Sequence, residues 1–393
     1  MQQKLLQPPA LGFSEYHRVC AWSPNVMKRV IQKAPNSEKA KPFRFPYTVN
    51  VLVFDRPNYL NKLLSSMREQ SLPLDESLLF FWVDGLNVDD YDFTKKSELV
   101  EKSKDLIKCY FPLSTVLESE KNLGIGLNYR RIQNFLTECS KLEWAVFLED
   151  DFILHENYFE TLIQFIQLVQ RDERVVSINC SGDSYEDSFS FHDCYLKVAR
   201  HSWGYAQRLS YLHESKSLLD GYYSLLEGKD YRNRNNSEIQ KFLLQNGMRP
   251  VLTSQDSVND VIRNKLKRIS LTTSDFGLEY IGEFGVHFNP SSFQKNGFHL
   301  RKVSESLIIP KDLDIEKIVD SLLSNNELRF EELSTHNFEI PLIHQRDEAI
   351  HQRDELRSST IWRVFRPYRK LTFFIKNSIN HSGKIIKRRT PNS

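Results

Sequence analysis

The chain has 393 residues, of which 40% are hydrophobic and 26% charged, so it can form a large buried core and is not globally disordered. Its 53 basic residues nearly balance its 51 acidic ones, and the net charge of +2 gives no indication of nucleic-acid binding. The apolar runs are strand-sized, shorter than the roughly 20 residues of a membrane-spanning helix.

The ends and the cysteines predict a cellular compartment. The N-terminus has no basic segment followed by an apolar one, so we expect no signal peptide. The five cysteines form no Cys-x-x-Cys pair: Cys20, Cys109, Cys139, Cys180 and Cys194. We therefore expect free thiols in a reducing cytoplasm, without a zinc site or a disulfide framework.

Between residues 47 and 178, β-branched and apolar runs alternate with helical patterns. Strands are predicted at 47–54, 77–83, 114–117, 144–148 and 174–178, and helices at 59–70, 94–108, 128–139 and 158–170. This alternation predicts an α/β fold, with a mostly parallel central sheet flanked by helices. Ligands bind beyond the carboxyl ends of the strands in such sheets, so the polar residues that follow the strands are the candidate site.

The rest of the sequence predicts an N-terminal extension before the main domain and helical segments toward its C-terminal side. Residues 1–45 contain five prolines and read as an N-terminal extension, before a main domain at 46–300. Residues 204–270 look mainly helical and polar, and 301–355 form a helical segment. Two similar heptads occupy 344–357, and because two repeats are few, an exposed charged helix is favoured over a coiled coil.

The last segment, residues 356–393, contains ten Lys and Arg and no Asp or Glu. Apolar and aromatic residues, including Trp362 and Phe365, alternate with these charges. A basic amphipathic segment of this kind is typical of contact with an anionic membrane surface, and we expect this partner rather than nucleic acid. A merely solvated tail is the alternative.

Three adjacent acids, Glu149, Asp150 and Asp151, directly follow the apolar strand at 144–148. Mutual repulsion and partial burial both raise the free energy of their ionised forms. A divalent cation that prefers oxygen ligands relieves this cost, and Mg²⁺ or Mn²⁺ commonly takes one or two carboxylates together with substrate phosphates. The alternative is a solvated acidic turn.

Other polar residues also follow strands or lie in flexible loops. Arg56 could reach a phosphate and Asp84 a base or ribose, although Asp84-Gly85 also reads as a plain turn. Trp203 could stack on a sugar or lie in the core, and His287 could bind a metal or diphosphate or simply be hydrogen-bonded in its loop.

Taken in order, these motifs resemble the GT-A nucleotide-sugar glycosyltransferases, in particular the N-acetylglucosaminyltransferase I family. The resemblance covers about residues 47–290 and implies a GT-A, Rossmann-like fold. It implies Asp151 as the direct ligand of Mn²⁺ or Mg²⁺, and Glu149 and Asp150 as residues that orient the ribose and donor sugar. The other implied nucleotide-sugar contacts are Arg56, Asp84, Asn128 and Arg130 of the Asn128-Tyr129-Arg130 segment, Trp203 and His287.

The same resemblance places the catalytic base in Asn259-Asp260-Val-Ile-Arg263, about 25 residues before Phe284-Gly285. Asp260 is the expected base. Asp256 is the reserve, because the family's first acid is Asn259 here and its Trp is missing.

A second resemblance concerns Leu356–Arg369, which is similar to a Ser-Thr-x-Trp-Arg segment at the ends of many bacterial glycosyltransferases that build surface polysaccharides. It implies a cytoplasmic enzyme, peripheral on the inner face of the cell membrane, with a saccharide or lipid-linked glycan acceptor. The expected activity is metal-dependent, inverting transfer of a hexosyl or N-acetylhexosaminyl group from a nucleotide sugar, with a UDP-sugar as the default. A sugar nucleotidyltransferase and a non-catalytic carbohydrate-binding or scaffold protein on the same fold are the alternatives.

Overall fold

A computed structural model describes residues 47–87, 92–183, 196–229, 234–249, 252–285, 289–305, 307 and 313–335. The chain divides into two compact units, Met1–Phe330 and Glu331–Ser393, and the description concerns the first. The predicted N-terminal extension, the two heptads, the basic tail, His287, Cys20 and Cys194 lie outside the described residues.

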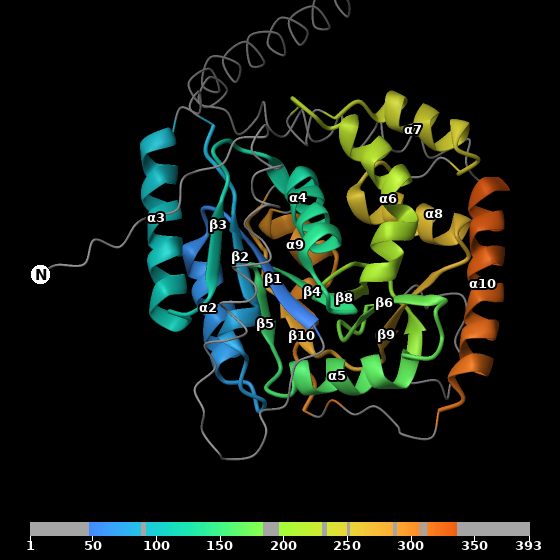
Figure 1. The fold of residues 1–393 in the computed structure, drawn as a ribbon, viewed down its shortest axis with the longest axis horizontal. Helices are drawn as coiled ribbons and strands as arrows, with labels where there is room; N and C mark the ends of the chain where they lie inside the picture. The colour runs from blue at the N-terminus through green and yellow to red at the C-terminus, as the bar shows by residue number, and fades with distance from the viewer. Residues whose placement is uncertain are drawn as a thin grey trace, which may run out of the picture. The chain divides into compact units, whose positions relative to one another are not determined.

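The described chain alternates strands and helices (Figure 1). The strands are β1 Tyr47–Val53, β2 Leu79–Val83, β3 Thr115–Glu118, β4 Trp144–Glu149, β5 Phe152–Leu154, β6 Val175–Asn179, β7 Leu196–Val198, β8 Tyr205–Arg208, β9 Ile269–Thr273 and β10 Leu278–Tyr280. The α-helices are α2 Pro57–Arg68, α3 Phe93–Tyr110, α4 Gly124–Cys139, α5 Tyr158–Val169, α6 Leu209–Ser224, α7 Asn236–Gln245, α8 Gln255–Lys265, α9 Pro290–Lys295 and α10 Ile315–Thr335; η2 Glu76–Leu78 and η5 Phe298–Leu300 are single 3₁₀ turns.

The central sheet has eight strands in the order β3-β2-β1-β4-β8-β6-β9-β7. Strands β3, β2, β1, β4, β6 and β9 share one direction, whereas β8 and β7 run opposite to their neighbours. A separate antiparallel pair joins β5 to β10. The mostly parallel, helix-flanked α/β sheet predicted from the sequence is confirmed.

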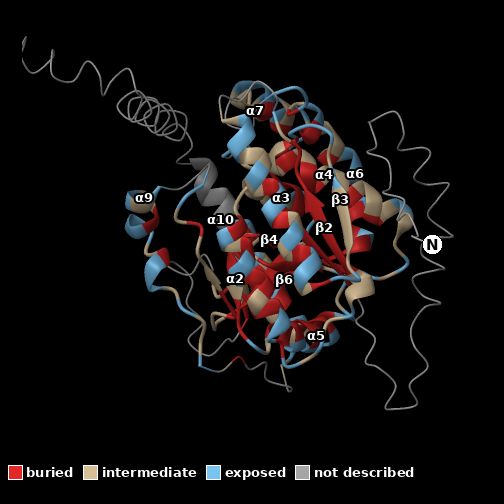
Figure 2. Ribbon diagram, turned by 90° about the vertical axis from the view of Figure 1, so that its left-hand side faces the viewer, coloured by how far each residue is buried: buried red, intermediate tan, exposed pale blue. Residues whose placement is uncertain are grey.

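Alternate residues of the inner strands face two separate cores, as the two-residue period of a β-strand requires. On β1, Val49 and Val51 enter one core, whereas Leu52 enters the other. The first core also contains residues of α2, α3, α5 and α10, and the second contains residues of α4, α6, α7 and α8. Figure 2 shows buried residues concentrated along the strands and on the helix faces that cover them.

This arrangement creates a switch point between β1 and β4. The chain leaves β1 through α2, which covers the first face, and reaches β4 from α4, which covers the second. Strand β2, which follows β1 along the chain, lies on one side of the β1–β4 pair, whereas the strands that follow β4 in the sheet lie on the other side. In open α/β sheets, the carboxyl ends of the strands at such a point are where ligands bind. Arg56 follows β1, Glu149 is the last residue of β4, and Asp150 and Asp151 follow it.

Two expectations change in the second half of the chain. Residues 204–270 are not only helical, because they also contain β8 and the start of β9. Both strands are short, so their two-residue period is hidden among helices. Helix α10 is more than an appended segment, because Val319 and Leu322 are buried in the first core. Among the described residues, none of the helices combines the length and the apolarity that crossing a bilayer requires.

Candidate functional site

An ion-paired cluster lies at the switch point. Pro57 is the first residue of α2 and its fixed φ suits a helix start, so Arg56 lies where β1 turns into the helix. The Arg56 guanidinium bonds to Asp150 through Nη2 and to Asp151 Oδ2 through Nη1 at 2.7 Å. Only 3% of each carboxylate side chain is exposed, against 28% of the Arg56 side chain. A single cation thus pairs with two buried carboxylates and leaves the cluster with a net negative charge.

The acids still carry a large electrostatic cost. Burial, followed by the like charges of Asp151 and Asp256, raises the pKa of Glu149 to about 8. Burial also raises the pKa of Asp150 to about 6, although the Arg56 charge opposes that shift. The cluster as a whole therefore favours additional positive charge, which is the condition predicted from the three adjacent acids.

Asp151 is the acid best suited to receive that charge. Its Oδ1 is buried and has no hydrogen-bond partner among the described residues, while its Oδ2 is bonded to Arg56. A buried carboxylate oxygen in this state is unfavourable unless a donor or a cation binds it. Nowhere in the described ranges do three or more His, Cys, Asp or Glu side chains converge as a metal-binding group. A cation here would therefore take Asp151 together with ligand and water oxygens, which suits Mg²⁺ or Mn²⁺.

The loop after β10 closes over the cluster. Strand β10 pairs with β5, and the Ile281 N–H donates to the Asp151 carbonyl at 2.9 Å. Gly282 has no room for a side chain, because a Cβ there would lie 2.5 Å from Asp151 Oδ2. At Gly285 a Cβ would lie 3.5 Å from Arg56 Nη1. The loop that was predicted to carry a ligand-binding histidine thus lies against the cluster, although His287 itself is outside the described residues.

Glu149 lies on the side of the sheet that α4 covers. Its Oε1 accepts a 3.3 Å hydrogen bond from the Tyr129 hydroxyl of α4. The Tyr129 ring stacks on Phe147 and Tyr205, which fixes the hydroxyl. Sequence reasoning selected the neighbours of Tyr129, whereas Tyr129 itself contacts the acidic motif.

Asp84 caps helix α4. Its Oδ1 accepts from the backbone N–H of Leu123 at 2.8 Å and of Gly85 at 2.9 Å, and its Oδ2 accepts from that of Gly124 at 2.9 Å. Asn128 also bonds to this carboxylate and leaves its own buried Oδ1 without a hydrogen bond among the described residues. Burial raises the pKa of Asp84, and the backbone bonds oppose the rise. The Asp84 carboxylate, which was expected to contact a base or ribose, is thus bound to backbone N–H groups of the protein. Among the described residues, the neighbouring acceptor without a hydrogen bond is Asn128 Oδ1.

Arg130 lies elsewhere. Its guanidinium bonds to Glu227, which follows α6, and lies 3.6 Å from Asp220 near the end of that helix. It makes no described contact with Glu149, Asp150 or Asp151. The structure therefore does not bring Arg130 together with the other expected nucleotide-binding residues.

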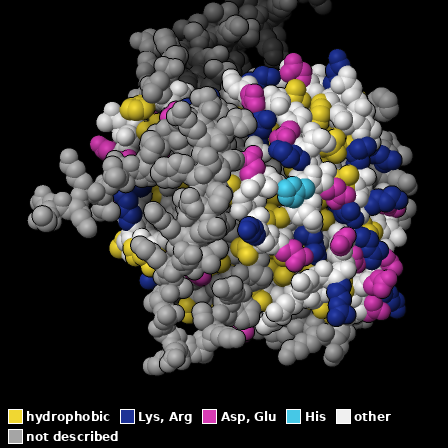
Figure 3. All heavy atoms as spheres, in the orientation of Figure 1, with side chains coloured by type: hydrophobic (Ala, Val, Ile, Leu, Met, Phe, Trp, Pro, Cys, Tyr) yellow, Lys and Arg dark blue, Asp and Glu magenta, His cyan; other side chains and the backbone are white. Residues whose placement is uncertain are grey.

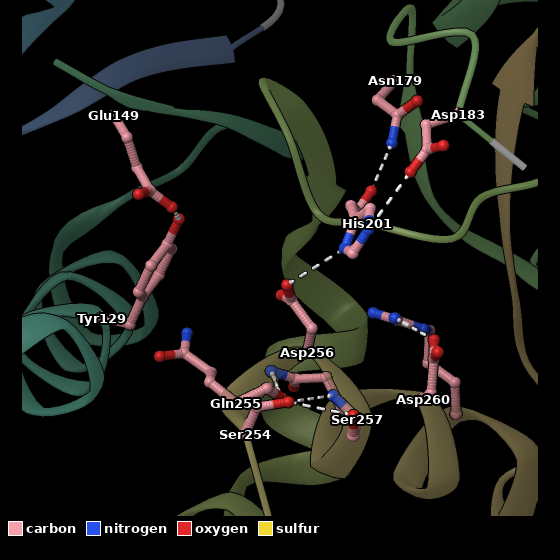
Figure 4. Close-up of polar contacts among 12 residues, drawn as sticks. Tyr129, Glu149, Asn179, Asp183, His201, Ser254, Gln255, Asp256, Ser257 and Asp260 are labelled. Atoms are coloured by element: carbon pink, nitrogen blue, oxygen red, sulfur yellow. Dashed lines mark hydrogen bonds and ion pairs between the residues drawn. The ribbon is translucent and has the colours of Figure 1, made fainter. Parts of the chain in front are cut away.

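The two candidate bases lie on the same helix but in different environments (Figure 4). Asp260 is bound to Arg263 at 2.6 Å, and both side chains are nearly buried. Asp256 lies one turn earlier, with 42% of its side chain exposed, on the side of α8 that faces His201 and Glu149. Burial tends to raise its pKa, but hydrogen bonds and charge from His201, Arg263 and Ser202 lower it overall. Asp256 is therefore the more accessible carboxylate.

Trp203 lies in an aromatic stack beside the cluster. Its ring is 4.6 Å from the His201 ring on one side and 4.8 Å from the Tyr280 ring on the other, and both pairs are nearly parallel. Gly204 has φ +51°, and its carbonyl accepts a hydrogen bond from the Tyr158 hydroxyl. The Trp203 faces are thus covered by protein, which agrees with the alternative of a packed tryptophan.

Sequence reasoning missed His201 and Asp183 as site residues. The His201-Ser-Trp-Gly204 segment was selected for its tryptophan, and Asp183 follows β6 in the same way that the acidic motif follows β4. The position after a parallel strand was therefore a usable signal for Asp183.

Figure 3 shows Lys and Arg intermingled with Asp and Glu over the described part of one face. This mixture agrees with the nearly balanced overall charge. It gives no support on that face for a surface of a single sign.

Comparison with known proteins gave matches among solved structures but none among family models or curated sequences. No family model and no curated protein sequence matches the chain. The mannosyltransferase PcManGT from Pyrobaculum calidifontis, solved with GDP-mannose and Mn²⁺, is 12% identical over 90% of this chain and 92% of its own, with a TM-score of 0.38. Residues 1–349 of S. aureus TarS, solved with UDP, are 12% identical over 56% of this chain and 70% of that one, with a TM-score of 0.32. Because both TM-scores are below 0.5, neither likeness supports an argument about function, and the N-acetylglucosaminyltransferase I resemblance is not confirmed.

Proposed function

We propose that the protein is a glycosyltransferase that moves a sugar from a nucleotide-sugar donor to a hydroxyl of a saccharide or lipid-linked acceptor. The observation that carries this proposal is the cluster of Arg56, Asp150 and Asp151 at the switch point of the sheet, with a buried Asp151 oxygen that lacks a partner. Such a site suits a diphosphate accompanied by a divalent cation. The sequence resemblance adds a UDP-sugar as donor and an inverting reaction.

In this proposal the residues of the cluster hold the diphosphate end of the donor. Arg56 has three of its five N–H donors directed at carboxylates, and its partly exposed guanidinium can turn toward phosphate oxygens. Asp151 would hold Mn²⁺ or Mg²⁺, and such an ion stabilises the charge that develops on the leaving nucleotide. Asn128 Oδ1 offers a buried acceptor for an N–H or O–H group of the nucleoside.

We assign the general base to Asp256 rather than to Asp260. The Asp256 carboxylate takes the proton of the acceptor hydroxyl while the acceptor oxygen bonds to the anomeric carbon, and the bond from that carbon to the diphosphate oxygen breaks. Asp256 is half-exposed and has a lowered pKa, so it is ionised and reachable at neutral pH. Asp260 is committed to Arg263 within the same helix.

The basic tail at 356–393 completes the proposal, by analogy of sequence alone, as a peripheral contact with the inner face of a bacterial cell membrane. Synthesis of a surface polysaccharide on a lipid-linked acceptor would use this location.

The test is a panel of nucleotide sugars with simple saccharide acceptors, in which nucleoside diphosphate release and glycoside formation are measured with Mn²⁺ present. Asp256→Asn should lower turnover by about 10²–10⁴-fold. Asp260→Asn is the matched control and should keep more activity. Pyrophosphate as the released product would indicate a nucleotidyltransferase, and turnover unchanged in Asp256→Asn would refute the assigned base.

A further inference from the structure

His201 lies between two carboxylates from different parts of the chain (Figure 4). Its Nε2 is 3.3 Å from Asp183 Oδ2, and its Nδ1 is 3.9 Å from Asp256 Oδ2. Asp183 belongs to the loop after β6, and Asp256 to the first turn of α8. The imidazole is the only side chain in the described structure that forms an ion-pair contact with both acids.

The orientation of the His201 ring is fixed on several sides. The Asn179 amide donates to the His201 carbonyl at 3.0 Å, and the Trp203 ring stacks on the imidazole at 4.6 Å. Asp183 is itself held, because 3% of its side chain is exposed and its Oδ1 lies 2.5 Å from Arg301 Nη1. A fixed ring with one nitrogen at a buried carboxylate presents its other nitrogen in a defined direction, toward Asp256.

The charges around Asp256 come from several elements. Glu149 of β4 is a like charge near it when ionised, and Tyr129 and Tyr205 also interact with it electrostatically. His201 and Arg263 of α8 are the groups whose hydrogen bond and charge lower the pKa of Asp256. Because Arg263 is bound to Asp260, the group best placed to stabilise an ionised Asp256 is the His201 ring.

We propose that His201 is a positioning residue for Asp256: the ring, held beside Asp183 and against Trp203, places its Nδ1 next to the Asp256 carboxylate and, when protonated, keeps that carboxylate ionised and in place. This inference rests on the proposed function, in which Asp256 accepts the acceptor proton. His201 is not itself a catalytic residue in this scheme. Its effect is to keep the base deprotonated, and so to extend activity to lower pH.

The first test needs no activity. Histidine Cε1–Hε1 NMR signals are followed against pH in the full chain, and the His201 signal is assigned as the one lost in His201→Gln. Asp183→Asn and Asp256→Asn should each lower the His201 pKa, by about one unit or more, since each removes an opposite charge near the ring. Asp320→Asn, an exposed partner of Arg174 at the far end of β6, is the control and should leave it unchanged. A His201 pKa unchanged in Asp183→Asn or in Asp256→Asn would overturn the proposal.

The second test uses the pH dependence of kcat/KM with the donor found in the panel. In His201→Gln the acid limb should move up by about one pH unit, because Asp256 loses the nearby cation, and activity should recover at higher pH. UDP binding should be unchanged. A uniform loss of rate with an unmoved limb would show a purely structural role and overturn the proposal. A wild-type chain that turns over no donor would instead contradict the proposed function, and the NMR titration would still decide whether His201 is coupled to both acids.

Discussion

Replacing Arg56 with glutamine removes the cation that pairs with two buried carboxylates. Asp150 and Asp151 are each 3% exposed, and the Arg56 side chain is 28% exposed, so solvent can screen little of the charge that remains. Breaking a buried ion pair by removing one partner typically costs about 3–5 kcal/mol. Since Asp150 already has a raised pKa and can take up a proton, we expect the lower end, about 3 kcal/mol.

This cost has a measurable thermal equivalent. With an unfolding entropy proportional to chain length, about 3 kcal/mol spread over the roughly 290 residues between Tyr47 and Thr335 lowers Tm by about 5 °C. The measurement is thermal unfolding by circular dichroism at pH 7.5 without divalent ions. Asp150→Asn in the Arg56→Gln background should restore part of the loss, because one of the two unpaired charges is removed.

The matched control is Arg174→Gln. Arg174 also contacts two carboxylates, but the Asp172 and Asp320 side chains are 13% and 62% exposed, against 3% for each acid at the switch point. Exposed pairs contribute about 0–1 kcal/mol, so this variant should unfold within about 2 °C of the wild type. If Arg56→Gln is no less stable than Arg174→Gln, the carboxylates at the switch point are solvated and the reasoning is refuted.

Three further predictions concern the same edge of the sheet. Gly282→Ala should weaken UDP binding with Mn²⁺ at least tenfold by calorimetry, because its Cβ would clash with the Tyr280 hydroxyl, lie 2.5 Å from Asp151 Oδ2 and so disturb the cluster; Gly285→Ala, which has space, should bind normally. Without divalent ions, Tm should fall as pH rises from about 4.5 to about 8 and level off above that, because Glu149 binds its proton more tightly when folded, and Glu149→Gln should flatten this dependence. Asp84→Asn should lower the free energy of unfolding by about 1–2 kcal/mol in urea, since an amide has one oxygen for the three N–H groups that the carboxylate accepts.

The sheet and its acidic edge could be predicted because they depend on local patterns. The apolar run before Glu149 defines a buried strand, and the parallel order then places the acids beside the end of β1. The start of α4 was placed four residues late, because the Asp84 cap that begins it lies 40 residues away from Gly124 in sequence. A cap supplied from another strand leaves no signal at the helix itself.

The choice of base could not be predicted for a similar reason. Asp256 and Asp260 are four residues apart, so both project from the same side of one helix. What separates them is Arg263 at one and His201 at the other, and the second partner comes from a distant loop. The contact between Asp183 and His201 forms where the loop after β6 meets the loop before β8. The spacing of residues within either loop does not predict such a meeting.

The central claim is that Asp151 binds a divalent cation together with a diphosphate. Calorimetric titration of UDP into the full chain, with and without Mn²⁺, tests it most directly in the wild type and in Asp151→Asn. We predict that Mn²⁺ tightens UDP binding at least tenfold in the wild type and that Asp151→Asn abolishes this gain. Equal UDP affinity with and without Mn²⁺ in the wild type, or a full gain in Asp151→Asn, would contradict the account.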